Sequence, residues 1–241
     1  MQININSLID NSLEATDGEI GTIKSFYFDD DTWTIRYMVV KTGSWLSGRK
    51  VLIYTGAILK DSWEGQTLPV NLTKEKVSSS PDIDTEKPVS RQQEQELFTH
   101  YPWNNYWGGG FYGGGIWGIM SPASSIDNTI IKEPDIAITQ PKGDPHLRST
   151  AVVSGYNIHA ADGDIGHITD FIADDQTWQL SFFVVDTHNW FGGKKVLIPV
   201  SDIKEVQWDN SKVIVNITMD AVKNSKLFNE SEFRHMEINR L

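Results

Sequence analysis

The chain has 241 residues, of which 39% are hydrophobic and 22% charged, and its formal net charge is −11. This composition is typical of a folded globular protein, and the acidity argues against a nucleic-acid partner, because phosphate binding needs a basic surface. The absence of cysteine excludes disulfide scaffolds, thiolate metal sites and cysteine nucleophiles.

The first ten residues contain no basic region followed by an apolar run, so we expect no secretory signal and a cytoplasmic protein. The stretch 101–126 carries no formal charge and is long enough to cross a bilayer, but it contains Pro102, Pro122 and many glycines. Because glycine and proline weaken a helix, we expect neither a spanning helix nor membrane contact there.

Two long segments match without a gap when the chain is shifted by the distance from Asp17 to Asp162. The matching ranges are 15–21 with 160–166, 29–33 with 174–178, 45–53 with 190–198, and 70–73 with 215–218. Such self-similarity indicates an internal duplication. We therefore predict two copies of one domain at 1–80 and 148–229, a dissimilar connector at 81–147 and a C-terminal tail at 230–241.

Each copy alternates strand-forming runs with turn-forming residues, which predicts an all-β domain. In the first copy, strands are expected at 19–28, 33–42, 50–53 and 67–72, with a further strand carrying Trp63. The acidic run 29–31 is predicted to form a hairpin turn, and Asp17 and Asp162 to hydrogen-bond the backbone nearby. Thr73 and Thr218 are expected to cap short helices. So many short strands must close on themselves to bury a core, so we predict a small β-barrel in each copy.

Both copies resemble the PRC-barrel family. The resemblance rests on Asp-Gly-x-Ile-Gly at 17–21 and 162–166, on the acidic turn that follows, on a Val-Val strand end, and on Gly-[Arg/Lys]-Lys-Val-Leu-Ile at 48–53 and 193–198. It implies two PRC-type barrels in tandem. The family includes the barrels of the photosynthetic reaction-centre H subunit and of a ribosome-maturation factor. We expect no counterpart here of the other segments of those proteins and transfer neither role, so an electron-transfer role is an alternative that rests on the resemblance alone.

The connector differs in composition from both copies. Residues 90–98 are predicted to form a short helix, since Gln and Glu are good helix formers. Aromatic residues among glycines follow, including Trp107 and Trp117. They form either a surface for a partner or a linker whose aromatics dock on the barrels, and we favour the linker, because ordering glycine costs conformational entropy.

The candidate binding residues combine tryptophan with paired cations. In the first copy they are Trp45, Arg49 and Lys50, and in the second copy Trp190, Lys194 and Lys195, with Trp107 and Trp117 added from the connector. An exposed tryptophan beside two cations suits an acidic partner. The alternative, which we favour, is that Trp45 and Trp190 plug a barrel end while the cations remain in solvent.

No pattern in the sequence points to catalysis or to a metal. The acidic turns 29–31 and 174–175 lack the spacing of a calcium loop, and the six histidines form no metal-binding motif. We expect no metal, no cofactor and no enzyme activity. An acid–base pair such as His159 with Asp162 in an apolar pocket would reverse that expectation.

A duplicated scaffold without catalytic residues predicts an interaction or assembly module with a protein partner. The two barrels are expected to pack as a pseudo-symmetric pair, or the chain to form a homodimer. The alternative is a stress-related protein that holds a small molecule or an ion between the barrels.

Overall fold

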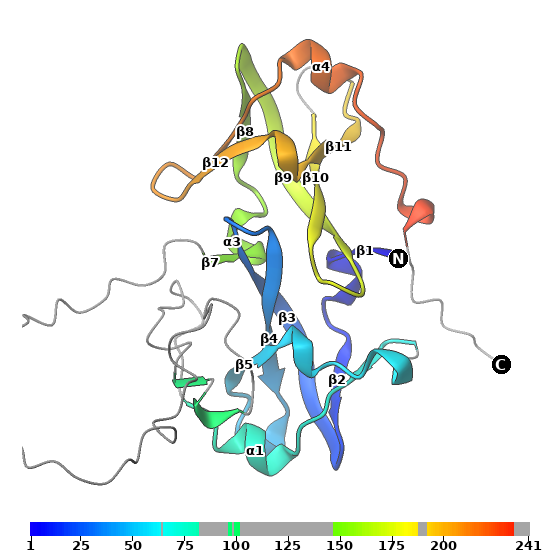
Figure 1. The fold of residues 1–241 in the computed structure, drawn as a ribbon, viewed down its shortest axis with the longest axis vertical. Helices are drawn as coiled ribbons and strands as arrows, with labels where there is room; N and C mark the ends of the chain where they lie inside the picture. The colour runs from blue at the N-terminus through cyan, green and yellow to red at the C-terminus, as the bar shows by residue number, and fades with distance from the viewer. Residues whose placement is uncertain (64, 82–95, 98, 102–146, 188–191, 234–241) are drawn as a thin grey trace, which may run out of the picture.

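The computed structural model describes residues 1–63, 65–81, 96–97, 99–101, 147–187 and 192–233. These residues form two mostly antiparallel β-sheets, one for each repeat (Figure 1). The all-β expectation is therefore confirmed, with short helices at the sheet ends. Both sheets contain one parallel pair, β2 with β6 and β8 with β13, which brings the last strand of each repeat beside an early one.

The N-terminal repeat contains six strands within the described residues. They are β1 (Gln2–Asn4), β2 (Ser12–Ala15), β3 (Gly18–Asp29), β4 (Thr34–Thr42), β5 (Lys50–Tyr54) and β6 (Thr67–Pro69). The helix α1 (Lys74–Ser78) and the 3-10 turns η1 (Asn6–Leu8), η2 (Ser44–Leu46), η3 (Thr55–Ala57) and η4 (Lys60–Ser62) connect or follow them.

The C-terminal repeat follows the same order. Its strands are β7 (Leu147–Ser149), β8 (Asn157–Ala160), β9 (Gly163–Asp174), β10 (Leu180–Asp186), β11 (Lys195–Pro199), β12 (Ile203–Gln207) and β13 (Lys212–Val215). Its helices are α3 (Thr150–Val153) and α4 (Met219–Lys223), with 3-10 turns η5 (Val200–Asp202) and η6 (Glu230–Glu232).

The predicted strand around Trp63 is wrong for the first repeat. Residues Lys60–Ser62 form a 3-10 turn, whereas the corresponding residues of the second repeat belong to β12. Asp61 and Ser62 favour turns, and the second repeat has the strand former Val206 in place of Asp61.

Turn chemistry explains the acidic runs, as predicted. The Oδ1 atom of Asp29 accepts hydrogen bonds from the backbone N–H groups of Asp31 at 3.0 Å and Thr32 at 2.9 Å. Asp174 repeats this pattern, accepting from Thr177 N at 2.8 Å and Gln176 N at 3.0 Å. The hydrogen bond from Thr177 is the main reason why the pKa of Asp174 falls to about 2.

The aspartates of the Asp-Gly turns act at longer range than predicted. Asp17 Oδ1 accepts from the backbone N–H of Lys74, and Asp162 Oδ1 accepts from that of Met219, both at 2.8 Å. Each aspartate therefore holds the start of the short helix that ends its repeat. The predicted caps are confirmed: Thr73 accepts from Lys76 N, and Thr218 accepts from Ala221 N.

The second glycine of the repeated motif is required by the close approach of two strands. A Cβ atom on Gly21 would lie 2.1 Å from the carbonyl oxygen of Lys41, and one on Gly166 would lie 1.9 Å from that of Asp186. No side chain fits at these distances, so the motif marks a point where the backbones of the paired strands β3 and β4, and of β9 and β10, come unusually close.

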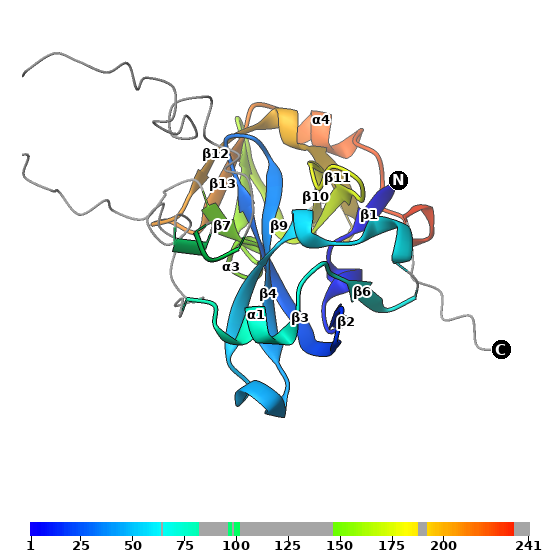
Figure 2. The same cartoon turned by 60° about the horizontal axis from the view of Figure 1, so that its bottom comes forward.

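The two repeats exchange their first strands. Strand β1 pairs with β9 of the second repeat, with Gln2 opposite Asp174, and β7 pairs with β3 of the first repeat, with Leu147 opposite Asp29. The repeat shift converts one pairing into the other, so the exchange is reciprocal and pseudo-twofold. Figure 2 shows β1 lying beside the strands of the second half.

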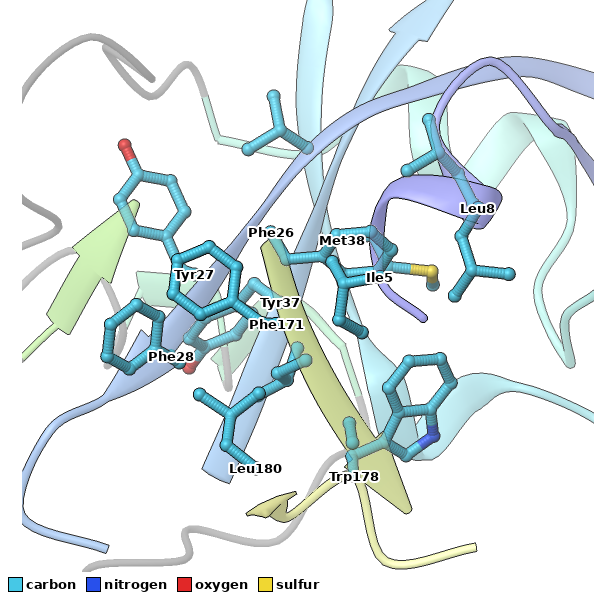
Figure 3. Close-up of a cluster of buried hydrophobic side chains, with 14 of the residues drawn as sticks. Ile5, Leu8, Phe26, Tyr27, Phe28, Tyr37, Met38, Phe171, Trp178 and Leu180 are labelled. Carbon is cyan, nitrogen blue, oxygen red and sulfur yellow. The ribbon is translucent and has the colours of Figure 1, made fainter. Parts of the chain in front are cut away.

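The hydrophobic core is continuous across the junction. The Phe28 ring lies 5.7 Å from that of Phe171, and the Trp178 ring lies 6.1 Å from that of Phe26. Figure 3 shows Phe171, Trp178 and Leu180 of the second repeat packed among Ile5, Phe26 and Phe28 of the first. Because their side chains are buried together, we infer that the two repeats form one folding unit.

Candidate functional site

The hairpin loop of the first repeat is packed against its own barrel. Trp45 is half-buried, its Nε1 donates to the carbonyl of Ile20 at 2.7 Å, and the Lys74 ammonium lies 4.8 Å from the ring centroid. This is the contact expected of a barrel-end plug. The binding role of Trp45 stays a prediction.

The two cations of this loop have different surroundings. The Nη2 group of Arg49 donates to the carbonyls of Ser80 at 2.5 Å and Pro81 at 3.0 Å, so Arg49 holds the start of the connector against the barrel. Lys50 is exposed and lies opposite Lys41, which is also exposed, on the neighbouring strand. This register places two positive charges side by side at this end of the barrel, where they repel each other.

The other predicted binding residues are only partly visible. Lys194 and Lys195 are exposed at the equivalent hairpin of the second repeat, where Asp186 lies opposite Lys195. Trp190, Trp107 and Trp117 lie outside the described residues. The two hairpins therefore differ in charge at the position of Lys41.

One aromatic residue of the connector docks on the first barrel. Tyr101 is fully buried together with Leu97, and burial raises the pKa of its hydroxyl to about 12. The neighbouring His100 contacts the carbonyl of Lys76 through Nε2 at 2.8 Å. At this position the connector behaves as the docked linker that the sequence analysis favoured.

The junction contains a mostly buried ion pair that the sequence did not predict. The Nε of Arg148 donates to Oδ2 of Asp30 at 2.7 Å, with side chains only 12% and 10% exposed, and the guanidinium carbon lies 5.7 Å from the Trp208 ring centroid. The repeat-related acid, Asp175, is buried and accepts from the Met1 amino group at 2.6 Å. The second acid of each turn therefore binds a cation that lies on the exchanged strand (Arg148) or directly before it (Met1).

A buried carboxyl group also holds the exchanged N-terminal segment. Asp170 Oδ1 accepts from the backbone N–H groups of Phe171 at 2.7 Å and Asn6 at 3.1 Å. Burial raises the pKa of Asp170 to about 6, against the lowering effects of these hydrogen bonds, the Asn4 side chain and the Lys195 charge. The first repeat has Ser25 at this position, so the other half of the exchange has no carboxyl group there.

We expect Asp170 to make the native chain less stable as pH rises from about 4 to 7. A folded-state pKa above the ordinary value means that the folded state binds the proton more tightly, so the stabilisation is complete below the ordinary pKa and lost as pH rises through about 6. Asp170→Asn keeps a carbonyl acceptor but no charge. Its free energy of unfolding relative to the native chain should increase by up to about 3 kcal/mol between pH 4 and pH 7, measured by urea denaturation. Parallel pH profiles for the two proteins would contradict this assignment.

The acid–base pair considered from sequence does not form. Asp162 holds the start of α4, and Nδ1 of His159 instead contacts the carboxylate of Asp164, whose side chain is 78% exposed. Within the described ranges, no group of three or more histidine or acidic side chains is arranged to hold a metal ion.

Comparison with known proteins identifies the family. The model of the PRC-barrel domain matches residues 1–77 and 154–222, which together make up more than half of the chain. No curated protein matches the sequence. None of the helices in the described part of the chain is long and apolar enough to cross a membrane. The two matched ranges coincide with the two sheets and with the repeated motifs, and the chain therefore belongs to the PRC-barrel family, with two such domains in tandem.

Proposed function

We propose that the chain is a non-enzymatic assembly module that presents its two hairpin ends to an acidic protein partner. The main support for the proposal is that the two hairpin ends belong to repeats that are joined into one folded unit. Strand exchange and a shared core join the two repeats, and α1 and α4 lie at opposite ends of the long axis (Figure 1).

The hairpins with the paired cations lie beside these helices. Lys74 of α1 contacts Trp45 in the first hairpin, and β11, which begins at Lys195, lies near α4 in both views. Two cationic strand starts, Lys50 of β5 and Lys195 of β11, held on one body would let one chain bind two partner molecules, or two sites on one partner, with the gain in affinity that comes from linkage. Interfacial charges of this kind mainly set specificity and association rate.

Crosslinking mass spectrometry on the full chain in native lysate tests this proposal. Charge reversal by Lys50→Glu should remove crosslinks between the partner and the first hairpin only, and Lys194→Glu those of the second hairpin only. The double variant should lose both sets, whereas Lys212→Glu, on β13, is the matched control and should retain them. If no protein is enriched, or if the double variant keeps its crosslinks, the proposal is wrong.

A further inference from the structure

A pocket of about 280 Å³ lies at the junction between the two repeats. Its walls are the acidic-turn residues Asp30, Asp31 and Trp33 of the first repeat, Arg148 on the exchanged strand β7, and residues 204–206 of β12. This volume is near the lower limit of small-molecule sites in proteins. It therefore fits a ligand of metabolite size.

The repeat shift relates this pocket to a second one, which has a different lining. The second pocket, of about 370 Å³, contains Leu59, Lys60 and Asp61 where the first contains Lys204, Glu205 and Val206, and Gln176 where the first contains Asp31. Arg148 corresponds to Ile3. Both pockets lie at equivalent junctions, so the fold does not require the particular set of charges that lines the first.

The guanidinium of Arg148 is held in place through one of its nitrogen atoms, which leaves N–H donors for a ligand. Asp30 binds its Nε, and the ring of Trp208 lies beneath its carbon atom. Within the described part of the chain, its two Nη groups have no hydrogen-bond partner. A guanidinium held in this way is suited to bind a carboxylate through parallel N–H donors.

The pocket carries charges of both signs beside an apolar wall. Lys204 adds an exposed cation, while Asp31 and Glu205 are exposed acids, and Trp33 and Val206 provide apolar surface. A ligand of a single sign would meet like charges in this pocket. A ligand with a carboxylate and an ammonium group would find a partner for each.

We propose that this junction pocket binds a small zwitterion of the α-amino-acid class. The carboxylate lies at Arg148 and Lys204, the ammonium group lies at Asp31 and Glu205, and the side chain rests against Trp33. This site is independent of the hairpin ends, which are at other positions in the fold, so either proposal can fail alone.

Isothermal titration calorimetry of the full chain with a panel of free α-amino acids tests the site. At least one member should bind, and its decarboxylated amine and deaminated acid should each bind about tenfold more weakly or not at all, since each lacks one charge-assisted contact. Lys204→Met should weaken binding of the intact amino acid by about tenfold. Lys204 is exposed, so this variant is expected to fold.

Lys60→Met is the matched control, because Lys60 lines the repeat-related pocket. It should leave the affinity unchanged. If the panel gives no binding heat, if Lys204→Met and Lys60→Met have equal effects, or if the deaminated acid binds as tightly as the amino acid, the assignment is overturned.

Discussion

Replacing Trp178 by alanine is expected to lower the free energy of unfolding by about 3–5 kcal/mol, the usual cost of removing a large buried aromatic side chain. Trp178 belongs to the second repeat, is 3% exposed, and packs on Phe26 and Trp63 of the first. The loss should therefore appear in both repeats at once. Urea denaturation followed by far-ultraviolet circular dichroism measures it.

Trp45→Ala is the matched control for this substitution. Trp45 is only half-buried and contacts residues of its own repeat, so its removal should cost clearly less. An equal loss for the two variants, or a Trp178→Ala chain in which the first repeat keeps its native stability, would contradict the shared core.

Replacing Arg148 by methionine is expected to cost about 3 kcal/mol, because it leaves the buried Asp30 carboxylate without its guanidinium partner. The variant keeps most of the apolar stem of the side chain, so the loss reports on the charge rather than on packing. Thermal and urea denaturation at neutral pH measure it.

The double variant Arg148→Met/Asp30→Asn separates the ion pair from the fold. Because a neutral pair removes the unpaired charge, most of the lost stability should return. If the double variant is less stable than Arg148→Met by the full cost of a second independent substitution, the two side chains do not act as a pair.

Most of the fold within each repeat could be predicted from local chemistry. In the acidic turns, Asp29 and Asp174 accept hydrogen bonds from backbone N–H groups two or three residues further along the chain. Such contacts depend only on neighbours in sequence. The helix caps at Thr73 and Thr218 are local in the same way. The matching motif glycines fixed the correspondence between the repeats.

The strand exchange could not be predicted, because nothing in three-residue strands specifies which sheet they join. Gln2–Asn4 and Leu147–Ser149 are short, and their partners are distant in sequence. For the same reason, the contacts between the two repeats at the junction could not be predicted from the sequence. In the sequence Asp30 has the pattern of a turn residue. Its second role, as the ion-pair partner of Arg148, depends on the exchange that brings β7 beside β3.

The sequence predicted which residue types form the candidate site, but it did not predict the contacts that each of them makes. Arg49 and Lys50 are adjacent cations in the sequence, yet one binds the carbonyl groups of Ser80 and Pro81 while the other is exposed. Which cation meets a carbonyl depends on where the chain runs after α1, and no local pattern encodes that path.

Strand exchange is expected to make the two PRC barrels one cooperative unit. Hydrogen exchange of the full chain across a urea titration, read by mass spectrometry on peptides from β4 and from β10, tests it most directly. Both strands should lose protection at the same urea midpoint, in the native chain and in Trp178→Ala. Separate midpoints for β4 and β10, with only one of them shifted by Trp178→Ala, would contradict it.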